Sequence, residues 1–252
     1  MRIHERVRGL SLVLFVLGVL LANVLPAEAL GGAHQGEVFY LCYVGQRTQV
    51  GGELSDTFAP CKASADKSRY WVPVLYRNGT AVKPSRFHVY LRNMVGATPK
   101  VFPSTLRWVA GNPNATSAQL GWSQRYFWQC GDTTASTHYA TPPNCANATN
   151  GQGETALTLI VKFPQCWTGS KWTYPTNGGC PSGSTLTLQL QEHVQYTIAD
   201  GARANMRLST GSIYGLHAGF DSGWTTSVLQ SYINQCVETG KSCHVRTDGK
   251  IS

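Results

Sequence analysis

The sequence has few charged residues and no cluster of them. Of 252 residues, 13 are Asp or Glu and 21 are Lys or Arg, which gives a net charge of +8 at pH 7. The basic residues are scattered, without the basic run or basic helix typical of proteins that bind nucleic acid. We therefore expect no nucleic-acid partner, whereas an anionic surface or glycan is permitted.

The common catalytic motifs are also absent. The sequence contains no Gly-x-Ser-x-Gly elbow, no His-Glu-x-x-His helix, no phosphate-binding loop and no Cys-x-x-Cys pair. A glycosidase needs two carboxylates at a set separation, and the sequence does not say which acids would pair. The candidates are Glu53, Asp56, Glu154, Glu192, Asp200 and Asp221. We expect no bound metal and no cofactor.

Only one hydrophobic run is long enough to approach the thickness of a membrane. It is "GLSLVLFVLGVLLANVL", which follows Arg2, Arg6 and Arg8 and precedes Ala27-Glu28-Ala29. This order is typical of a secretory signal peptide spanning residues 1–29, with cleavage before Leu30. The alternative is an uncleaved membrane anchor. We expect a secreted, extracellular protein with no membrane partner after cleavage.

Eight cysteines follow that segment. An even number in an exported chain indicates disulfide bonds, because that environment is oxidising. Spacing alone does not determine the pairing, and a zinc site would require cysteines or histidines at closer ligand spacing. The simplest pairing joins neighbours along the chain: Cys42 with Cys61, Cys130 with Cys145, Cys166 with Cys180, and Cys236 with Cys243.

Three segments have the hydrophobic pattern of β-strands. In 70–92 a short apolar run and an Asn-Gly turn precede an alternating stretch, which puts Phe87, Val89 and Leu91 opposite His88, Tyr90 and Arg92. Residues 154–164 indicate a buried strand, and in 184–196 leucines alternate with Thr187, Gln189 and Gln191. Segments rich in Gly, Pro, Asn and Thr predict long loops at 111–118, 131–153 and 175–184.

One amphipathic helix is predicted near the C-terminus. In "TTSVLQSYINQCV" the apolar residues recur at helical spacing, Ser222 or Thr225 could cap its start, and Gly240 follows its end. Trp224, just before it, is expected to anchor the core. The fold class is therefore all-β: a disulfide-stapled antiparallel β-sandwich or jelly roll with long loops and one C-terminal helix. We expect one domain over residues 30–244 and a short tail over 245–252.

The stretch "SIYGLHAGFDSGW" (212–224) contains the residues that could carry chemistry. His217 and Asp221 would lie on the same face if the segment is extended, so they are candidate catalytic residues. The alternative is that this stretch is a packing corner between the β-rich core and the helix. We favour the packing corner, because a lone His beside an Asp more often makes a structural hydrogen bond.

Aromatic residues in the predicted loops suggest a different class of function. Trp and Tyr rings can stack on sugars, although they also fill cores. The candidates for glycan binding are Trp108, Trp122, Trp128 and Trp172, with Tyr126 and Tyr174 nearby.

Three segments resemble a known family in the same order. They are "KSRYWVPVLYRNGTAVKPSRFHVYLR", "LTLIVKFPQCWTGSKWTYPTNGGCP" and "HAGFDSGWTTSVLQSYINQC". The sequence over most of residues 39–236 is similar to the domain-of-unknown-function family nineteen ninety-six, found in secreted fungal and actinobacterial proteins. The resemblance implies no reaction. It does imply a His-x-His pair near the start, a His after the Cys-Trp segment, and a His-x-Asp-Phe element before the last helix.

The sequence departs from this pattern at most points. Phe39 and Leu41 stand where the His pair would fall, the loop after Cys166-Trp167 has no His, and Gly219 occupies the Asp position. Glycine can neither bind a metal nor accept a proton through a side chain. We therefore predict an exported surface or wall-associated binding protein with a cell-wall or matrix glycan as its partner. The alternative is a divergent secreted hydrolase or metal-dependent enzyme that uses His217 and Asp221.

Overall fold

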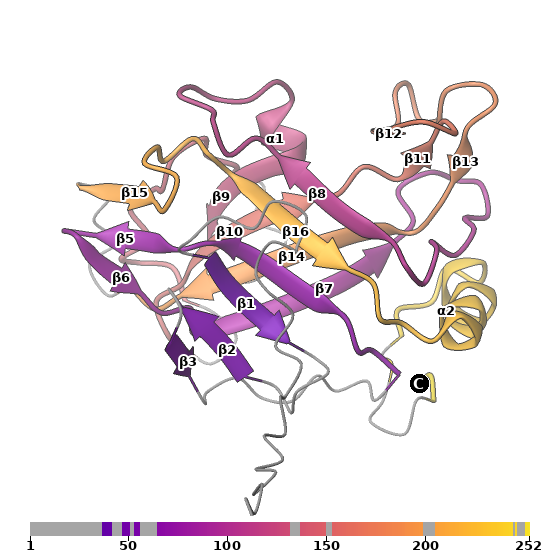
Figure 1. Cartoon of the computed structure of the whole chain (residues 1–252), viewed down its shortest axis with the longest axis horizontal. Coiled ribbons are helices and arrows are strands. Elements are labelled where there is room, and N and C mark those ends of the chain that lie inside the picture. The colour runs from indigo at the N-terminus through magenta and orange to yellow at the C-terminus, as the bar shows by residue number, and fades with distance from the viewer. Residues whose placement is uncertain are drawn as a thin grey trace, which may run out of the picture.

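A computed structural model describes residues 65–131, 137–149, 153–198, 205–243, 245 and 250–252, together with the backbone of three strands nearer the N-terminus (Figure 1). The predicted signal peptide and the predicted Cys42–Cys61 bond lie outside these residues. Over the described part of the chain, no helix has the length and hydropathy needed to span a membrane.

Antiparallel sheets are the main regular structure of the described residues, as the all-β prediction requires. The largest sheet has the order β3-β2-β1-β4-β16-β8. Its strands are β1 (Glu37–Leu41), β2 (Arg47–Val50), β3 (Glu53–Ser55), β4 (Arg69–Pro73), β8 (Arg107–Gly111) and β16 (His217–Asp221). Strands that are far apart in the sequence thus become neighbours, since β16 pairs with both β4 and β8.

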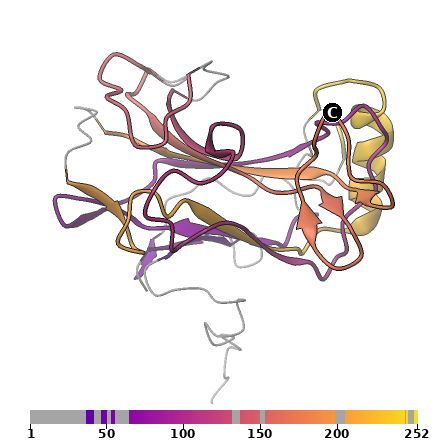
Figure 2. The same ribbon diagram turned by 90° about the horizontal axis from the view of Figure 1, so that it is seen from above.

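A four-stranded sheet with the order β7-β14-β10-β9 forms the second layer. Its strands are β7 (Arg86–Arg92), β9 (Tyr126–Cys130), β10 (Leu157–Lys162) and β14 (Gln189–Tyr196). Figure 2 shows the two sheets as stacked layers of a sandwich. The core between them contains inward residues of both sheets, including Tyr70, Phe220, Leu159, Leu190 and Val194.

Two small sheets and a short helix extend the sandwich. One sheet contains β5 (Leu75–Arg77), β6 (Thr80–Val82) and β15 (Met206–Leu208), and the other contains β11 (Cys166–Trp167), β12 (Trp172–Thr173) and β13 (Thr185–Leu186). The short helix is α1 (Trp122–Arg125). The predicted Asn78-Gly79 turn joins β5 to β6, with positive φ at both residues.

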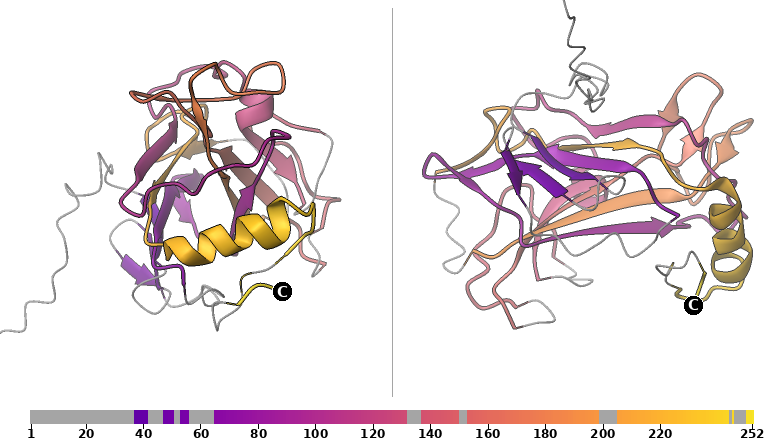
Figure 3. Two further views of the ribbon diagram at one scale, coloured as in Figure 1. Left: turned by 90° about the vertical axis from the view of Figure 1, so that its right-hand side faces the viewer. Right: turned by 60° about the horizontal axis from the view of Figure 1, so that its bottom comes forward.

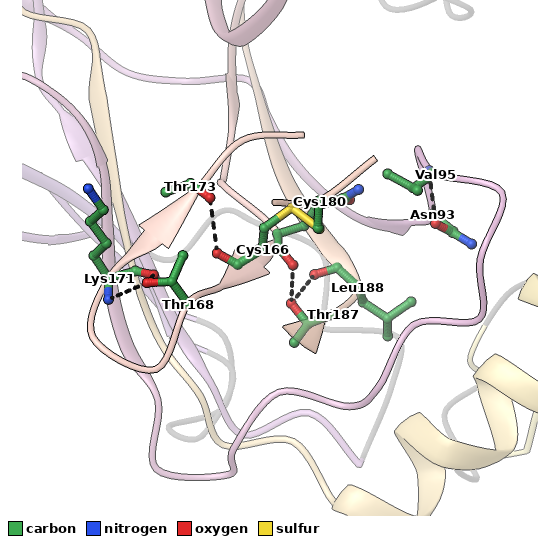
Figure 4. The surroundings of a disulfide bond; sticks show 10 residues. Asn93, Val95, Cys166, Thr168, Lys171, Thr173, Cys180, Thr187 and Leu188 are labelled. Atoms are coloured by element: carbon green, nitrogen blue, oxygen red, sulfur yellow. Dashed lines mark hydrogen bonds between the residues drawn. A yellow bond between two sulfur atoms is a disulfide. The ribbon is translucent and has the colours of Figure 1, made fainter. Parts of the chain in front are cut away.

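Three of the four predicted disulfides are confirmed. Cys130–Cys145, Cys166–Cys180 and Cys236–Cys243 are bonded. Cys166 lies at the centre of the β12-β11-β13 sheet, and its carbonyl oxygen accepts a hydrogen bond from Thr173 Oγ1 at 3.5 Å (Figure 4). Each bond therefore closes a short segment of the chain.

The predicted C-terminal helix is confirmed. α2 (Thr226–Tyr232) continues as a π-helical turn over Ile233–Val237, with Thr225 at its N-cap position. Leu229, Ile233 and Cys236 are buried, which is the apolar face that the sequence pattern indicated. Figure 3 shows the helix lying across one end of the sandwich.

The packing corner before this helix exists, but it is shorter than predicted. Residues 217–221 are a strand, and the corner begins at Ser222. Trp224 is buried, as predicted, and its Nε1–H donates to the Tyr70 hydroxyl at 2.9 Å. Tyr70 in turn donates to Asp66 Oδ2 at 2.8 Å, and Ser68 N–H donates to Asp66 Oδ1 at 2.9 Å. This network joins the segment before β4 to the segment before α2.

Because Asp66 is buried, the stability of this packing corner depends on pH. Desolvation raises the pKa of its carboxyl from the ordinary 3.8 to about 6, against the opposing effect of its hydrogen bonds. The folded protein therefore binds this proton more tightly than the unfolded chain does. The stabilising effect of the proton is complete below pH 3.8 and is lost as the pH rises to about 6.

We predict that ionisation of Asp66 lowers the free energy of unfolding by on the order of 2 kcal/mol between pH 4 and pH 6. Asp66→Asn keeps an oxygen for the Ser68 N–H and cannot ionise, so its urea unfolding free energy should fall less over this interval than that of the wild type. A variant with the same slope as the wild type would contradict the assignment.

Candidate functional site

His217 and Asp221 lie on one face of β16 but do not form a pair. Four residues of extended strand place their Cα atoms about 13 Å apart. His217 is buried, and its Nδ1–H donates to the Gly215 carbonyl at 2.7 Å. Asp221 forms an ion pair with Arg69 at 2.7 Å. Burial raises the pKa of Asp221, while Arg69 and Arg107 oppose that shift. A direct His-Asp dyad is therefore incompatible with the strand.

Trp71 occupies the space between these two residues. It is the register partner of Gly219, and its ring meets that of His217 edge-on at 5.7 Å. A Cβ atom built on Gly219 would lie 1.7 Å from Trp71 Cε2, which is far inside van der Waals contact. Glycine at 219 is thus required by the packing of this indole ring. Among the described residues, no group of three His, Cys, Asp or Glu side chains could hold a metal ion.

The predicted glycan-binding tryptophans do not form one surface. The expectation that they are exposed loop residues is wrong for Trp108 and Trp128, which are 5% and 0% exposed because they lie on strands and face the core. Trp122, in α1, and Trp172 are half-buried. Trp172 packs against Trp108 with ring centroids 4.4 Å apart. Of the nearby tyrosines, Tyr126 is buried and Tyr174 is half-buried.

A different group of side chains gathers on the outer face of the four-stranded sheet. Alternate residues of a strand face opposite sides, and Phe87, Leu91, Leu190 and Val194 face the core. Their neighbours therefore face outward. We call this group the polar face: His88, Tyr90 and Arg92 of β7, Lys162 of β10, and Gln189, Gln191 and His193 of β14. Arg92 is exposed, and Tyr90, His88, His193 and Lys162 are half-buried, so these side chains reach solvent, whereas Gln189 and Gln191 are buried among them.

A directional hydrogen-bond chain runs along β14 on this face. His193 Nε2–H donates to Gln191 Oε1 at 3.3 Å, and Gln191 Nε2–H donates to Gln189 Oε1 at 2.7 Å. Burial, followed by the charges of Arg92, Lys162 and His88, lowers the pKa of His193 to about 3. The imidazole is therefore neutral over most of the pH range and has a fixed tautomer.

Tyr90 is the aromatic centre of the polar face. Its ring centroid lies 4.7 Å from the ring centroid of His193. The Arg92 guanidinium lies over the Tyr90 ring, 4.9 Å from the centroid of that ring. The hydroxyl is 3.4 Å from His88 Nδ1. These contacts hold the ring in place without burying it completely, which is the state expected of a ring that contacts a ligand.

A loop covers the β9 side of the same sheet. His138 stacks on Phe127 with ring centroids 3.7 Å apart, and Tyr139 pairs with Trp128 through main-chain hydrogen bonds of 2.8 and 2.9 Å. Lys162 Nζ lies 5.1 Å from the Phe127 ring. This loop, tied to β9 by Cys130–Cys145, marks one edge of the polar face.

The opposite side of β14 contains an isolated carboxyl. Glu192 is fully buried, and neither oxygen has a hydrogen-bond partner in the part of the chain that the structure describes. Its register neighbours are Val89 and Val161. Desolvation raises its pKa well above the ordinary value. Glu192 therefore does not belong to the polar face, although it lies between two of its residues in sequence.

Comparison with known proteins identifies a family for this chain but no function. The family model for a domain of unknown function, DUF1996, matches residues 42–224, which is most of the chain. The chain belongs to the DUF1996 family. No curated protein and no solved structure matches it. Membership in DUF1996 therefore assigns neither a ligand nor a reaction.

The backbone register explains which DUF1996 positions come together. Phe39, at one position that the resemblance assigns to histidine, pairs with Trp71, and Trp71 pairs on its other side with Gly219, at the Asp position. Segments about 180 residues apart in this DUF1996 chain thus meet in one row of the six-stranded sheet. Trp71 fills the space above Gly219, so in this chain that position has no room for a carboxylate.

We predict that Gly219→Ala destabilises the fold by roughly 3 kcal/mol, because the buried Trp71 ring must shift. Trp71→Leu removes the clashing atoms, so the same glycine substitution should cost much less in that background. Urea unfolding of the four proteins gives the coupling energy. Gly96→Ala, where an added Cβ meets no atom within 4 Å, is the control. Equal costs in both backgrounds would rule out the Trp71 contact as the cause.

We predict that Glu192→Leu raises the free energy of unfolding by about 1 to 3 kcal/mol at pH 7, since an unpaired carboxyl is replaced by an apolar group between valines. Because the raised pKa favours the protonated form in the fold, this gain should shrink as the pH falls from 7 toward 4.5 and stay constant below that pH. Glu192→Gln should remove the pH dependence and keep the polar cost. Destabilisation by Glu192→Leu at every pH would show that the carboxyl has a partner.

Proposed function

We propose that this DUF1996 protein is an exported carbohydrate-binding protein of the cell surface or wall, and that the polar face is its binding surface. The observation that carries the proposal is one sheet face on which a half-buried tyrosine ring adjoins a row of amide and imidazole groups. Sugars present hydroxyl groups together with patches of C–H bonds, and both kinds of protein group are present here.

Tyr90 supplies the apolar part of this recognition. A pyranose ring can stack its C–H face on the tyrosine ring once the exposed Arg92 side chain, whose guanidinium lies over that ring in the free protein, turns to the ligand. The ring stays in place through its contact with His193. Rings that are already held in place lose little conformational freedom on binding. The polar part comes from Gln189 and Gln191, whose amides are ordered by the hydrogen-bond chain.

The three disulfides support export. Such bonds persist in oxidising compartments and are rare in the cytosol. A binding role also fits the position of the acids. Of the six candidate carboxylates, Glu192 is in the core, Asp221 pairs with Arg69, and Glu154 lies 3.7 Å from Arg86. None of these three belongs to the polar face.

The test is a screen of the exported protein against wall and matrix polysaccharides, neutral and acidic, followed by calorimetry on any ligand found. We predict that Tyr90→Ala weakens binding about tenfold or more, the effect of losing about 1.4 kcal/mol of stacking. Tyr90→Phe keeps the ring and should retain most of the affinity.

Tyr76→Ala is the matched control. Tyr76 is also a half-buried strand tyrosine with an arginine over its ring, at 4.2 Å from Arg207, but it lies in the β15-β5-β6 sheet. Its removal should leave the affinity unchanged. The proposal fails if no polysaccharide binds, or if Tyr90→Ala binds as well as the wild type while remaining folded by circular dichroism.

A further inference from the structure

Two cations of the polar face lack carboxylate partners. Neither Arg92 nor Lys162 forms an ion pair with a described residue, whereas Arg69 and Arg86 do. Burial lowers the pKa of Lys162, and the charge of Arg92 lowers it further. The two positive charges are therefore near enough to repel each other across the sheet, and nothing in the described part of the chain neutralises them.

The backbone register places hydrogen-bond donors beside both cations. Gln189 is the register partner of Arg92, and Gln191 is the register partner of Lys162. The chain from His193 ends at Gln189, whose oxygen is used as an acceptor. The amide nitrogen of Gln189 is thus left to donate, and hydrogen bonds in series polarise one another. The Gln189 end of the chain therefore presents an N–H group beside Arg92.

His193 shows the same excess of positive charge. The charges that lower its pKa include the cations Arg92 and Lys162. Its Nδ1 atom has no hydrogen-bond partner among the described groups. The nearest acid in sequence, Glu192, faces the core on the other side of the strand. The polar face is therefore an electropositive surface built on a rigid sheet.

We propose that Arg92 and Lys162 together bind an anionic group of the ligand, a carboxylate or a sulfate ester, above Gln189 and Gln191. This inference rests on the proposed function, and it narrows the ligand from glycans in general to acidic glycans. A neutral sugar bound there would leave the two cations without a counter-charge, whereas an anion relieves their repulsion and accepts hydrogen bonds from both. Tyr90 would then stack on the sugar ring that carries the anionic group.

The experiment measures affinity by calorimetry for polygalacturonate, a sulfated dextran, unmodified dextran and inorganic sulfate. Comparing polygalacturonate with sulfated dextran shows whether the bound group is a carboxylate or a sulfate ester. Unmodified dextran tests the contribution of the sugar alone, and inorganic sulfate tests that of the anion alone. The variants are Arg92→Gln and Lys162→Met, the second of which keeps an apolar stem over Phe127. We expect at least one acidic polysaccharide to bind about tenfold or more tightly than unmodified dextran, and each variant to lose about tenfold.

The control is Arg207→Gln, which removes an equal charge from the cation–π pair with Tyr76 on another sheet. It should change affinity less than about twofold. Binding to the acidic polysaccharide should also weaken as salt increases from about 50 to 500 mM, since part of the attraction is Coulombic. Equal loss in Arg207→Gln and Arg92→Gln would show attraction to net charge only, and would overturn the inference.

The remaining outcomes separate this inference from the proposed function. A neutral glycan that requires Tyr90 but not Arg92 or Lys162 would overturn the anion site and leave the carbohydrate-binding proposal standing. Inorganic sulfate bound through Arg92, with no polysaccharide bound, would support the anion site and overturn the carbohydrate-binding proposal. Failure of every probe to bind would overturn both.

Discussion

The alternation of side chains along β14 is the constraint on which the rest of the structure depends. This strand lies between β7 and β10 and pairs with both along nearly its whole length. Leu190, Val194 and Tyr196 complete the core, while Gln189, Gln191 and His193 form the row to which the cations and Tyr90 are added. A slip of one residue would exchange the two sets, so the packing of the core fixes the register of the polar face.

The outer surfaces of the two sheets differ in how far their charged and aromatic side chains are buried and paired. On the six-stranded sheet, Trp71 is buried against Gly219 and His217, and the nearby charge of Asp221 is balanced by Arg69. On the four-stranded sheet, Glu154 pairs with Arg86, but Arg92 and Lys162 have no carboxylate partner among the described residues, and the rings of Tyr90 and His193 are only half-buried. Packing satisfies the groups on the first surface, whereas the second has groups that a ligand could satisfy. This contrast, rather than any catalytic motif, distinguishes the candidate site.

Local patterns predicted the elements well where one strand face is apolar. The alternation in 86–92 and 189–196 gave the correct inner and outer faces, although residues 185–186 form β13 in a separate small sheet. Three disulfides between neighbouring cysteines agree with chain order. The pattern could not show that Gln189 pairs with Arg92, because that contact spans almost 100 residues. Aromatic β8 and β9 were mistaken for loops because Gly, Asn and Pro flank them. β16 was missed because its central Gly219 is a poor strand residue, and only the Trp71 ring explains it.

The contact between Trp71 and Gly219 also restricts the order in which this sequence can evolve. Any side chain introduced at 219 meets the indole ring, so a carboxylate could not be introduced there in a single tolerated step. Trp71 would have to change first, and that change would open a cavity that selection on stability would oppose. The two positions are therefore epistatic, because the side chains that position 219 tolerates depend on the residue at position 71.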